Sequence, residues 1–237
     1  MTAALPSLTP PEAVREQLWN EQQLAQPVAV PGFRLWRYEA PAIVLGCSQR
    51  RLLAQADGEV PVLLRQSGGG AVLAGPWMLG LSVALPAGHP LARQGLVASY
   101  RWLGEAIARV LQQGGVDAQA LAPEALRALP AAQRTAVDWA CFGGLSPWEV
   151  LAQGRKIAGL AQVRRASGVL LVGGVLLQPS PWQLMCDALG RGGADARTLA
   201  ATTVSAAELA AHFDGQACAQ RLGLALQAAL EQEACPM

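Results

Sequence analysis

The sequence predicts a mixed α/β fold of the α+β class, with a central sheet flanked by helices. The chain has 237 residues, 52% of them hydrophobic, which is enough to bury a core without disulfides or metals. Short apolar runs typical of buried strands are mixed with longer segments that have helical spacing. The two kinds of segment do not alternate regularly, so a repeated βαβ arrangement is not predicted.

Helices are predicted where apolar residues recur every three or four positions. They are expected over 11–26, 91–113, 182–189 and 206–233, with a short helical turn over 51–55. Strands are expected over the apolar runs 33–38, 42–45, 60–65, 72–73, 78–85, 148–153, 156–164 and 169–177. Gly154 suits a hairpin turn between two of these strands, and 120–135 is interpreted as a loop with a helical turn.

Composition excludes several classes of partner. The formal net charge of +1 provides no bulk attraction to nucleic acid or to an anionic membrane. The longest uncharged run, 66–90, contains so many glycines and prolines that buried strands are predicted there, not a membrane-spanning helix. Five cysteines without a CxxC pair and only two histidines predict no metal site. The odd cysteine count and the lack of signal-peptide features over 1–11 predict a cytoplasmic protein.

The first candidate motif is the glycine loop at 65–72, which reads RQSGGGAV. Three glycines let a backbone approach a ligand closely and present its N–H donors. The segment lacks the lysine of a P-loop and the spacing of a dinucleotide-binding loop. On glycine content alone, a plain flexible turn is the better interpretation.

The second candidate is Lys156, within GRKIAGLAQ at 154–162. Of the 18 basic residues, 17 are arginines and Lys156 is the single lysine. Where any cation would serve, this chain uses arginine, so a lone lysine marks a position that needs a compact ammonium. Chance explains the count equally well, and a solvated lysine beside a hairpin turn is the alternative.

The third candidate is Cys141, within DWACFGG at 138–144. It precedes the hairpin that carries Lys156, so a thiolate there could be stabilised by the ammonium and act as a nucleophile. Taken alone, a small buried hydrophobic residue is the better interpretation.

These segments together resemble the lipoate–protein ligase and octanoyltransferase family, which shares its catalytic fold with biotin–protein ligases. Residues 65–72 resemble the signature R-R-x-[ST]-G-G-G-A-V, and 154–162 resemble G-[RK]-K-[IV]-[SAV]-G-[SN]-A-Q. Residues 36–49 resemble the preceding strand pair, and 168–177 resemble G-[VA]-[LI]-L-Q-H-G-x-[IL]-L. The stretch 140–150 resembles the C-F-x-x-P-S-W-Y-E-L of octanoyltransferases that use a cysteine nucleophile.

The resemblance implies the site residues and the domain organisation. Lys156 falls on the family's catalytic lysine and Cys141 on the nucleophile of the cysteine-dependent type. The implied substrate-binding residues are Arg65, Ser67, Gly68, Gly69, Gly70, Ala71, Gly159 and Ala161. The chain is expected to be one biotin/lipoate protein ligase-type catalytic domain over 1–237, with a core at 15–190 and a helical part at 206–233, and without the extra C-terminal domain of large lipoate ligases.

Three departures from the family pattern remove polar groups. The usual His-Asp after the glycine loop is replaced within 73–76, and the usual Gln-His-Gly is Val-Gly-Gly at 172–174. Gln66 replaces the second arginine of the signature. The pocket is therefore expected to be less polar than the family type.

The implied function is an acyltransferase that attaches octanoyl or lipoyl groups to a lysine of lipoyl-domain proteins. Cys141 would attack the thioester of an acyl carrier protein, Lys156 would bind the acyl carbonyl, and no cofactor would be needed. In one alternative, an ATP-dependent lipoate ligase forms an acyl-adenylate with ATP and Mg²⁺, and Cys141 takes no part. In a second alternative, the protein binds acyl groups or lipoyl domains without catalysis.

Overall fold

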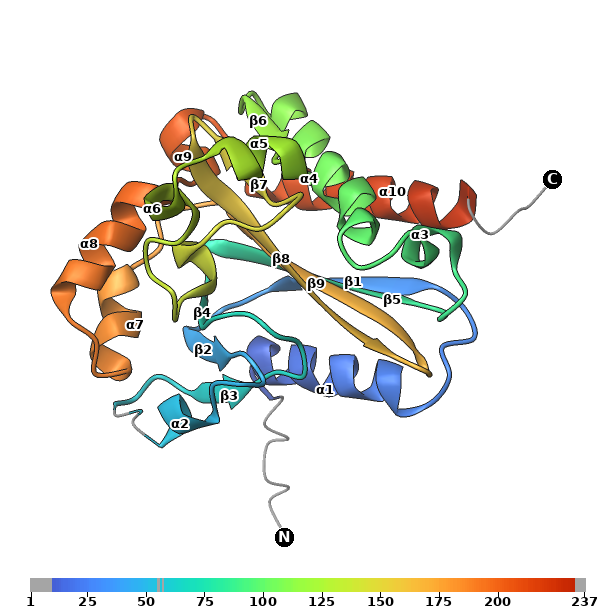
Figure 1. Ribbon diagram of the computed structural model, residues 1–237, viewed down its shortest axis with the longest axis horizontal. Helices are drawn as coiled ribbons and strands as arrows, with labels where there is room; N and C mark the ends of the chain where they lie inside the picture. Colours follow the sequence, from blue (N-terminus) through green and yellow to red (C-terminus); the bar gives the residue numbers. More distant parts are fainter. Residues whose placement is uncertain (1–9, 55, 57, 233–237) are drawn as a thin grey trace, which may run out of the picture.

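The computed structural model describes residues 10–54, 56 and 58–232 of the chain. Its largest element is a six-stranded sheet with the order β1-β5-β9-β8-β7-β6, in which every neighbouring pair is antiparallel. The strands are β1 (Gly32–Arg37), β5 (Met78–Leu85), β6 (Ala118–Ala120), β7 (Val150–Ala152), β8 (Arg155–Arg165) and β9 (Gly168–Leu176). The long central strands β5, β9 and β8 form the platform on which the rest of the molecule packs (Figure 1).

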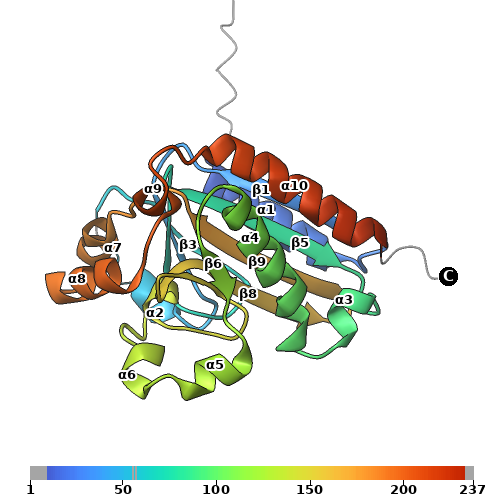
Figure 2. The same ribbon diagram turned by 90° about the horizontal axis from the view of Figure 1, so that it is seen from above.

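Helices cover both faces of this sheet. Helix α1 (Glu12–Ala25) packs on one face, whereas α3 (Pro90–Arg93), α4 (Arg101–Gln113) and α10 (Gly215–Gln232) lie on the other (Figures 1 and 2). Successive side chains along β5 point to opposite faces of the sheet, so this one strand contributes to the core on both sides. Leu79, Leu81, Val83 and Leu85 pack with α4 and α10, while Met78 and Ala84 belong to the clusters on the α1 side.

A second, three-stranded sheet lies on the α1 side of the large one. Its order is β3-β2-β4, formed by β3 (Val62–Leu64), β2 (Ala42–Leu45) and β4 (Val72–Ala74). Strand β2 pairs parallel to β3 and antiparallel to β4, so the mixed pairing of the fold is found in this small sheet. All four residues of β2 are buried, as the uninterrupted apolar run Ala-Ile-Val-Leu predicts.

Short elements close the remaining sides. They are α2 (Arg50–Leu53), η1 (Ala98–Tyr100), α5 (Pro123–Ala128), α6 (Ala131–Arg134), η2 (Cys141–Gly143), α7 (Trp182–Ala188), α8 (Gly193–Thr202) and α9 (Ala206–Leu209). Helices α7 and α8 pack together beside the small sheet, and α8 also contacts η2 (Figure 1). This contact supports the turn that carries Cys141.

The predicted α+β class is confirmed, and the strands and the hairpin at Gly154 are found close to their expected bounds. Two predicted helices are each wrong in one respect. The helix expected over 91–113 is divided into α3, η1 and α4, because Gly95 takes a φ of +93°.

The helix expected over 206–233 is divided into α9 and α10. Asp214 accepts hydrogen bonds from the N–H groups of Gln216 and Ala217, and so caps a new helix instead of continuing the old one. The expected ends at Gln55 and Glu233 lie outside the described residues, and the sequence reasoning missed α8 altogether. Across 10–54, 56 and 58–232, no helix is long and apolar enough to cross a membrane.

Candidate functional site

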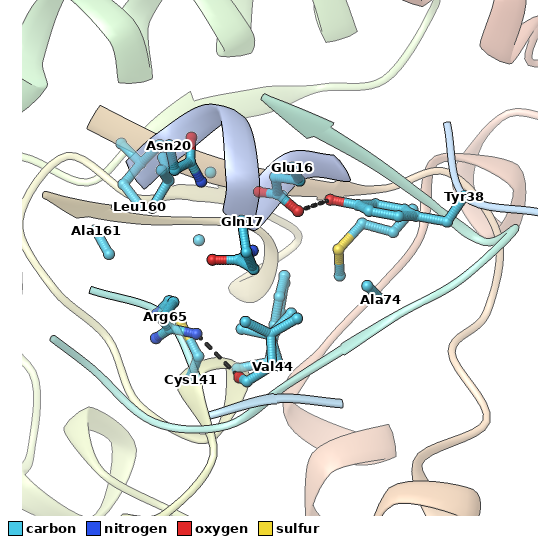
Figure 3. A pocket seen from close by; sticks show the side chains of 17 residues that line it. Glu16, Gln17, Asn20, Tyr38, Val44, Arg65, Ala74, Cys141, Leu160 and Ala161 are labelled. Carbon is cyan, nitrogen blue, oxygen red and sulfur yellow. Dashed lines mark hydrogen bonds between the residues drawn. The ribbon is translucent and has the colours of Figure 1, made fainter. Parts of the chain in front are cut away.

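A cavity lies between α1, the near face of the large sheet and the small sheet. It has about 520 Å³ of empty space, its mouth included. Its walls come from segments far apart in the chain: Glu16, Gln17, Asn20, Tyr38, Val44, Arg65, Val72, Ala74, Met78, Cys141, Phe142, Gly159, Leu160, Ala161, Val172, Gly173 and Gly174. Most of these side chains are apolar, and the polar ones gather on two sides (Figure 3).

The first polar side is built by Arg65, which organises the glycine loop. Its buried guanidinium donates to the carbonyl oxygens of Gly68 at 2.9 Å, Gly70 at 2.8 Å and Val44 at 3.1 Å. A planar guanidinium can bind several carbonyls at fixed angles, which a lysine cannot do. Arg65 thus links the glycine loop to β2 and fixes the shape of the loop.

The glycine loop in turn packs directly against the segment that carries Cys141. The N–H of Ala71 donates to Trp139 at 2.8 Å, and the N–H of Cys141 donates to Ala71 at 2.9 Å. A Cβ on Gly70 would lie 2.6 Å from the backbone of this segment, so only glycine allows the approach. The loop therefore has a structural role that its composition alone did not reveal: it places Cys141 at the cavity wall.

Lys156 is the second residue of β8, and its side chain is 1% exposed. Its ammonium donates to the carbonyl oxygens of Cys141 at 2.7 Å and Gly144 at 2.9 Å, and to Glu149 Oε1 at 2.7 Å. Lys156 is therefore directed at the Cys141 turn and not at the glycine loop. A Cβ built on Gly159 would lie 3.4 Å from Lys156 Nζ and 3.6 Å from Cys141 Sγ, so this glycine keeps open the space between the two groups.

Glu149 is the buried counter-charge of Lys156. Its Oε2 accepts the N–H of Ser146 at 2.7 Å, and its Oε1 also accepts the N–H of Leu160 at 3.2 Å. Burial raises the pKa of the Glu149 carboxyl, and the Lys156 charge and these hydrogen bonds act against that rise. The pair is thus a fully hydrogen-bonded ion pair inside the protein.

The second polar side of the cavity belongs to α1. Glu16 is 7% exposed and accepts a hydrogen bond from the Tyr38 hydroxyl at 2.8 Å (Figure 3). Burial raises the pKa of Glu16 to about 7, although the hydrogen bonds from Tyr38 and Asn20 and the charge of Arg65 oppose the rise. The buried Asn20 Oδ1 has no hydrogen-bond partner among the described residues, and it lines the same cavity.

The structure brings most of the predicted site residues together. Arg65, Cys141, Gly159 and Ala161 line the cavity, and Gly68, Gly70 and Ala71 connect Arg65 to the Cys141 segment. Ser67 is buried in the loop, and its hydroxyl has no partner in the described part of the chain. Gly69 is exposed, and its carbonyl packs against Gly46 and not toward the cavity.

Sequence reasoning missed three polar residues of this region, namely Glu149, Glu16 and Tyr38. Glu149 stands in the quoted stretch 140–150, where a glutamate directly before the apolar strand β7 was an available signal. Glu16 and Tyr38 gave no such signal, because they belong to separate elements. Gly80 leaves the room in which the Tyr38 ring reaches α1, since a Cβ there would overlap the Tyr38 hydroxyl.

Comparison with known families identifies the chain. The family described as the lipoyl protein ligase A/B catalytic domain matches residues 11–215. Curated relatives named octanoyltransferase LipM are 35% identical over 158 residues in Exiguobacterium sp. and 32% identical over 160 residues in Kyrpidia tusciae. These alignments cover 62% and 64% of this chain but 54% and 56% of the relatives, so the chain spans about half the length of the curated relatives it matches.

Solved structures share the fold. The putative lipoate protein ligase Ta0514 from T. acidophilum, with bound lipoic acid, superposes with a TM-score of 0.65 at 18% identity, over 94% of this chain and 83% of that one. A lipoate-protein ligase A bound with ATP gives a TM-score of 0.62 at 15% identity, over 92% and 81% of the two chains. At these identities the likeness concerns the fold alone.

Proposed function

Because the chain belongs to the lipoyl protein ligase A/B catalytic domain family, we propose that it transfers an octanoyl or lipoyl group to a lysine of a lipoyl-domain protein. The observation that supports this most is a thiol, Cys141, in the wall of a largely apolar cavity beside the buried ammonium of Lys156. The apolar wall suits a fatty acyl chain, and the thiol suits a covalent acyl intermediate.

In the proposed reaction the Cys141 thiolate attacks the thioester carbonyl of an acyl carrier protein. A bond forms between Sγ and the acyl carbon, the thioester C–S bond breaks, and the carrier leaves as a thiol after taking up a proton. The amine of the acceptor lysine then attacks the acyl-enzyme. An amide C–N bond forms, the Sγ–C bond breaks, and the proton of the amine returns to the Cys141 sulfur.

Lys156 would stabilise the oxyanion that develops on the acyl carbonyl in both steps. The space beside Gly159, between Lys156 Nζ and Cys141 Sγ, is where that carbonyl would lie. Arg65 would contribute indirectly, since its hydrogen bonds hold the glycine loop against the Cys141 segment.

The ATP-dependent ligase is the alternative, and the hydrogen bonding of Arg65 disfavours it. An acyl-adenylate needs positive charge for its phosphate. Here the Arg65 guanidinium donates to the carbonyls of Val44, Gly68 and Gly70. We therefore prefer the transferase, which needs no ATP, Mg²⁺ or other cofactor.

The proposed partners are an acyl carrier protein as donor and lipoyl-domain proteins as acceptors. One structural neighbour from Thermoplasma acidophilum is described as a bi-partite lipoate protein ligase studied with its E2 lipoyl domain, which supports an acceptor of this kind. The cysteines Cys47, Cys141, Cys186 and Cys218 are free thiols, which is compatible with the proposed cytoplasmic location.

Intact-mass measurement tests the proposal. The chain is mixed with octanoyl carrier protein, and an octanoyl adduct is expected that Cys141→Ala abolishes and Cys47→Ala, at an exposed thiol, retains. No adduct together with ATP-dependent modification of a lipoyl domain would contradict the transferase and support the ligase. Neither activity, with retained affinity for the carrier or the lipoyl domain, would support the non-catalytic binder.

A further inference from the structure

The hydrogen bonds of Lys156 leave its ammonium no unused donor. A lysine ammonium has three N–H groups, and here they point to Cys141 O, Gly144 O and Glu149 Oε1, all within 2.9 Å. A substrate carbonyl can therefore bind Lys156 only by taking the place of one of these acceptors. The remaining acceptors must then hold the ammonium where it is needed.

Of the three acceptors, Glu149 is the one that cannot readily be exchanged. It carries the only negative charge among the three, and separating a buried ion pair costs far more than exchanging one carbonyl for another. Its carboxylate is 2% exposed and is also held by the N–H groups of Ser146, in the loop before β7, and of Leu160, in β8.

The backbone before Glu149 is a strained, closely packed turn that fixes the position of Glu149. Trp148 takes a φ of +68°, a left-handed conformation that is costly for a bulky residue. The carbonyl of Trp148 packs so closely on α4 that a Cβ at Gly104 would lie 2.1 Å from its oxygen. The turn from Ser146 to Glu149 is also closed by the Glu149 side chain itself. This strained turn places the carboxylate at Lys156.

We propose that Glu149 is the positioning residue of the site: it holds Lys156 Nζ through the buried ion pair while the acyl carbonyl replaces the Cys141 or Gly144 carbonyl. The proposal rests on the proposed acyl transfer, because it specifies how the ammonium becomes available to the substrate. Glu149 itself does not contact the substrate. The exchange also frees a carbonyl of the Cys141 turn, so substrate binding and the position of the nucleophile are coupled.

The single lysine of the chain allows a direct test that needs no activity. Protein labelled with [ε-¹³C]lysine has one Cε signal, and its chemical shift and line width report the surroundings of the Lys156 side chain. Glu149→Gln keeps the shape of the side chain and removes its charge. The Cε signal is expected to move and to broaden, since an ammonium that has lost its carboxylate partner is no longer held in one position.

Kinetics then separate a positioning role from a merely structural one. For Glu149→Gln, kcat is expected to fall about 10- to 100-fold with KM for the acyl donor within about threefold, and Glu149→Asp, which restores the charge, to recover part of the loss. A structural defect would instead lower the amount of folded protein and leave the kcat of the folded fraction unchanged. Glu124→Gln removes the charge of an exposed ion pair with Arg127 and is the matched control, with no expected change.

Two outcomes would overturn the proposal: an unchanged Cε signal in Glu149→Gln, or a folded Glu149→Gln variant with wild-type kcat. If Glu149→Gln does not fold, Glu149→Asp keeps the charge but shortens the reach, and wild-type kcat in that variant would equally overturn it. A wild-type protein without acyl transfer, but with the expected change of the Cε signal in Glu149→Gln, would contradict the proposed function and leave the Glu149–Lys156 arrangement standing.

Discussion

Two buried glutamates lie in or near the cavity, and they differ in their partners: Glu16 lines it, whereas Glu149 lies outside the lining and binds Lys156, which in turn binds the Cys141 carbonyl. Glu149 forms an ion pair with Lys156 at 2.7 Å, whereas within the described part of the chain Glu16 forms no salt bridge and accepts a hydrogen bond from the Tyr38 hydroxyl. Burial raises the pKa of both carboxyls, and that of Glu16 reaches about 7. Of these two buried carboxyls, Glu149 is thus held in an ion pair, whereas Glu16 gains or loses a proton near neutral pH.

This difference assigns different tasks to two parts of the site. We call Glu149 and Lys156, with the Cys141 turn and the glycine loop that packs on it, the fixed side, and Glu16 with Tyr38 the adaptable side. The Glu149 side holds charges in place, which suits the stabilisation of a developing oxyanion. The Glu16 carboxyl can become neutral by taking up a proton, which suits a cavity wall that contacts an apolar chain. Four substitutions test whether this division is correct.

The largest effect is expected for Lys156→Arg, which tests the fixed side. The Lys156 ammonium is fully hydrogen-bonded, and a Cβ on Gly159 would lie 3.4 Å from Lys156 Nζ and 3.6 Å from Cys141 Sγ, so the wide planar group of an arginine would fit poorly. We expect the rate of acyl transfer to fall about 10²- to 10³-fold, comparable to removing an oxyanion donor. The reverse change on the same strand, Arg155→Lys, is the control. An active, folded Lys156→Arg enzyme would show that this side needs only a positive charge.

Glu16→Gln tests the adaptable side through the pH dependence of stability. The folded-state pKa of about 7 exceeds the ordinary value of 4.5, so the folded wild type retains a proton that the unfolded chain releases. Stability is therefore lost as pH rises from about 4.5 through 7, by roughly 3 kcal/mol for this group. Thermal melting from pH 5 to pH 8 is expected to show a flatter profile for Glu16→Gln, with Glu149 contributing equally to both proteins. Identical slopes would contradict the assigned burial of Glu16.

Gly70→Ala tests whether the fixed side depends on the close contact between the glycine loop and the Ala140–Cys141 backbone. The new methyl group would meet the Ala140–Cys141 backbone at 2.6 Å, so a loss of about 1–3 kcal/mol in the free energy of unfolding is expected. Gly68→Ala is a close control, because nothing lies within 4 Å of a Cβ there, and a change within about 0.5 kcal/mol is expected. Chemical denaturation of both variants measures the difference. Equal losses would mean that the loop is only a flexible turn.

The smallest effect is expected for Tyr38→Phe. The Glu16 carboxyl loses one hydrogen bond, which costs about 1 kcal/mol. That hydrogen bond also lowers the pKa of Glu16, so its loss should move the pH midpoint of stability upward. Urea denaturation at several pH values measures both the loss in the free energy of unfolding and the pH midpoint of stability. A downward move would show that Tyr38 does not donate to Glu16.

Sequence reasoning found the fixed side more completely than the adaptable one. Lys156, Cys141 and the glycine loop lie in continuous motifs, and their neighbours in the chain carry the signal. Glu16 and Tyr38 come from α1 and from the residue after β1, and only the packing of that helix on β5 brings them together. The helix breaks at Gly95 and Asp214 were missed because apolar periodicity continues across both positions, while a left-handed φ and a side-chain cap decide the structure locally.

The bridge between Ala71 and Ala140 has a consequence for how the protein folds. It joins segments about 70 residues apart in the chain. A contact that closes a long loop costs chain entropy before any stabilising interaction has formed, so such contacts form slowly. The hairpin of β8 and β9 is local and can form early, whereas the Cys141 turn must wait for β4 to arrive. The pocket is therefore expected to be among the last parts of the molecule to assemble.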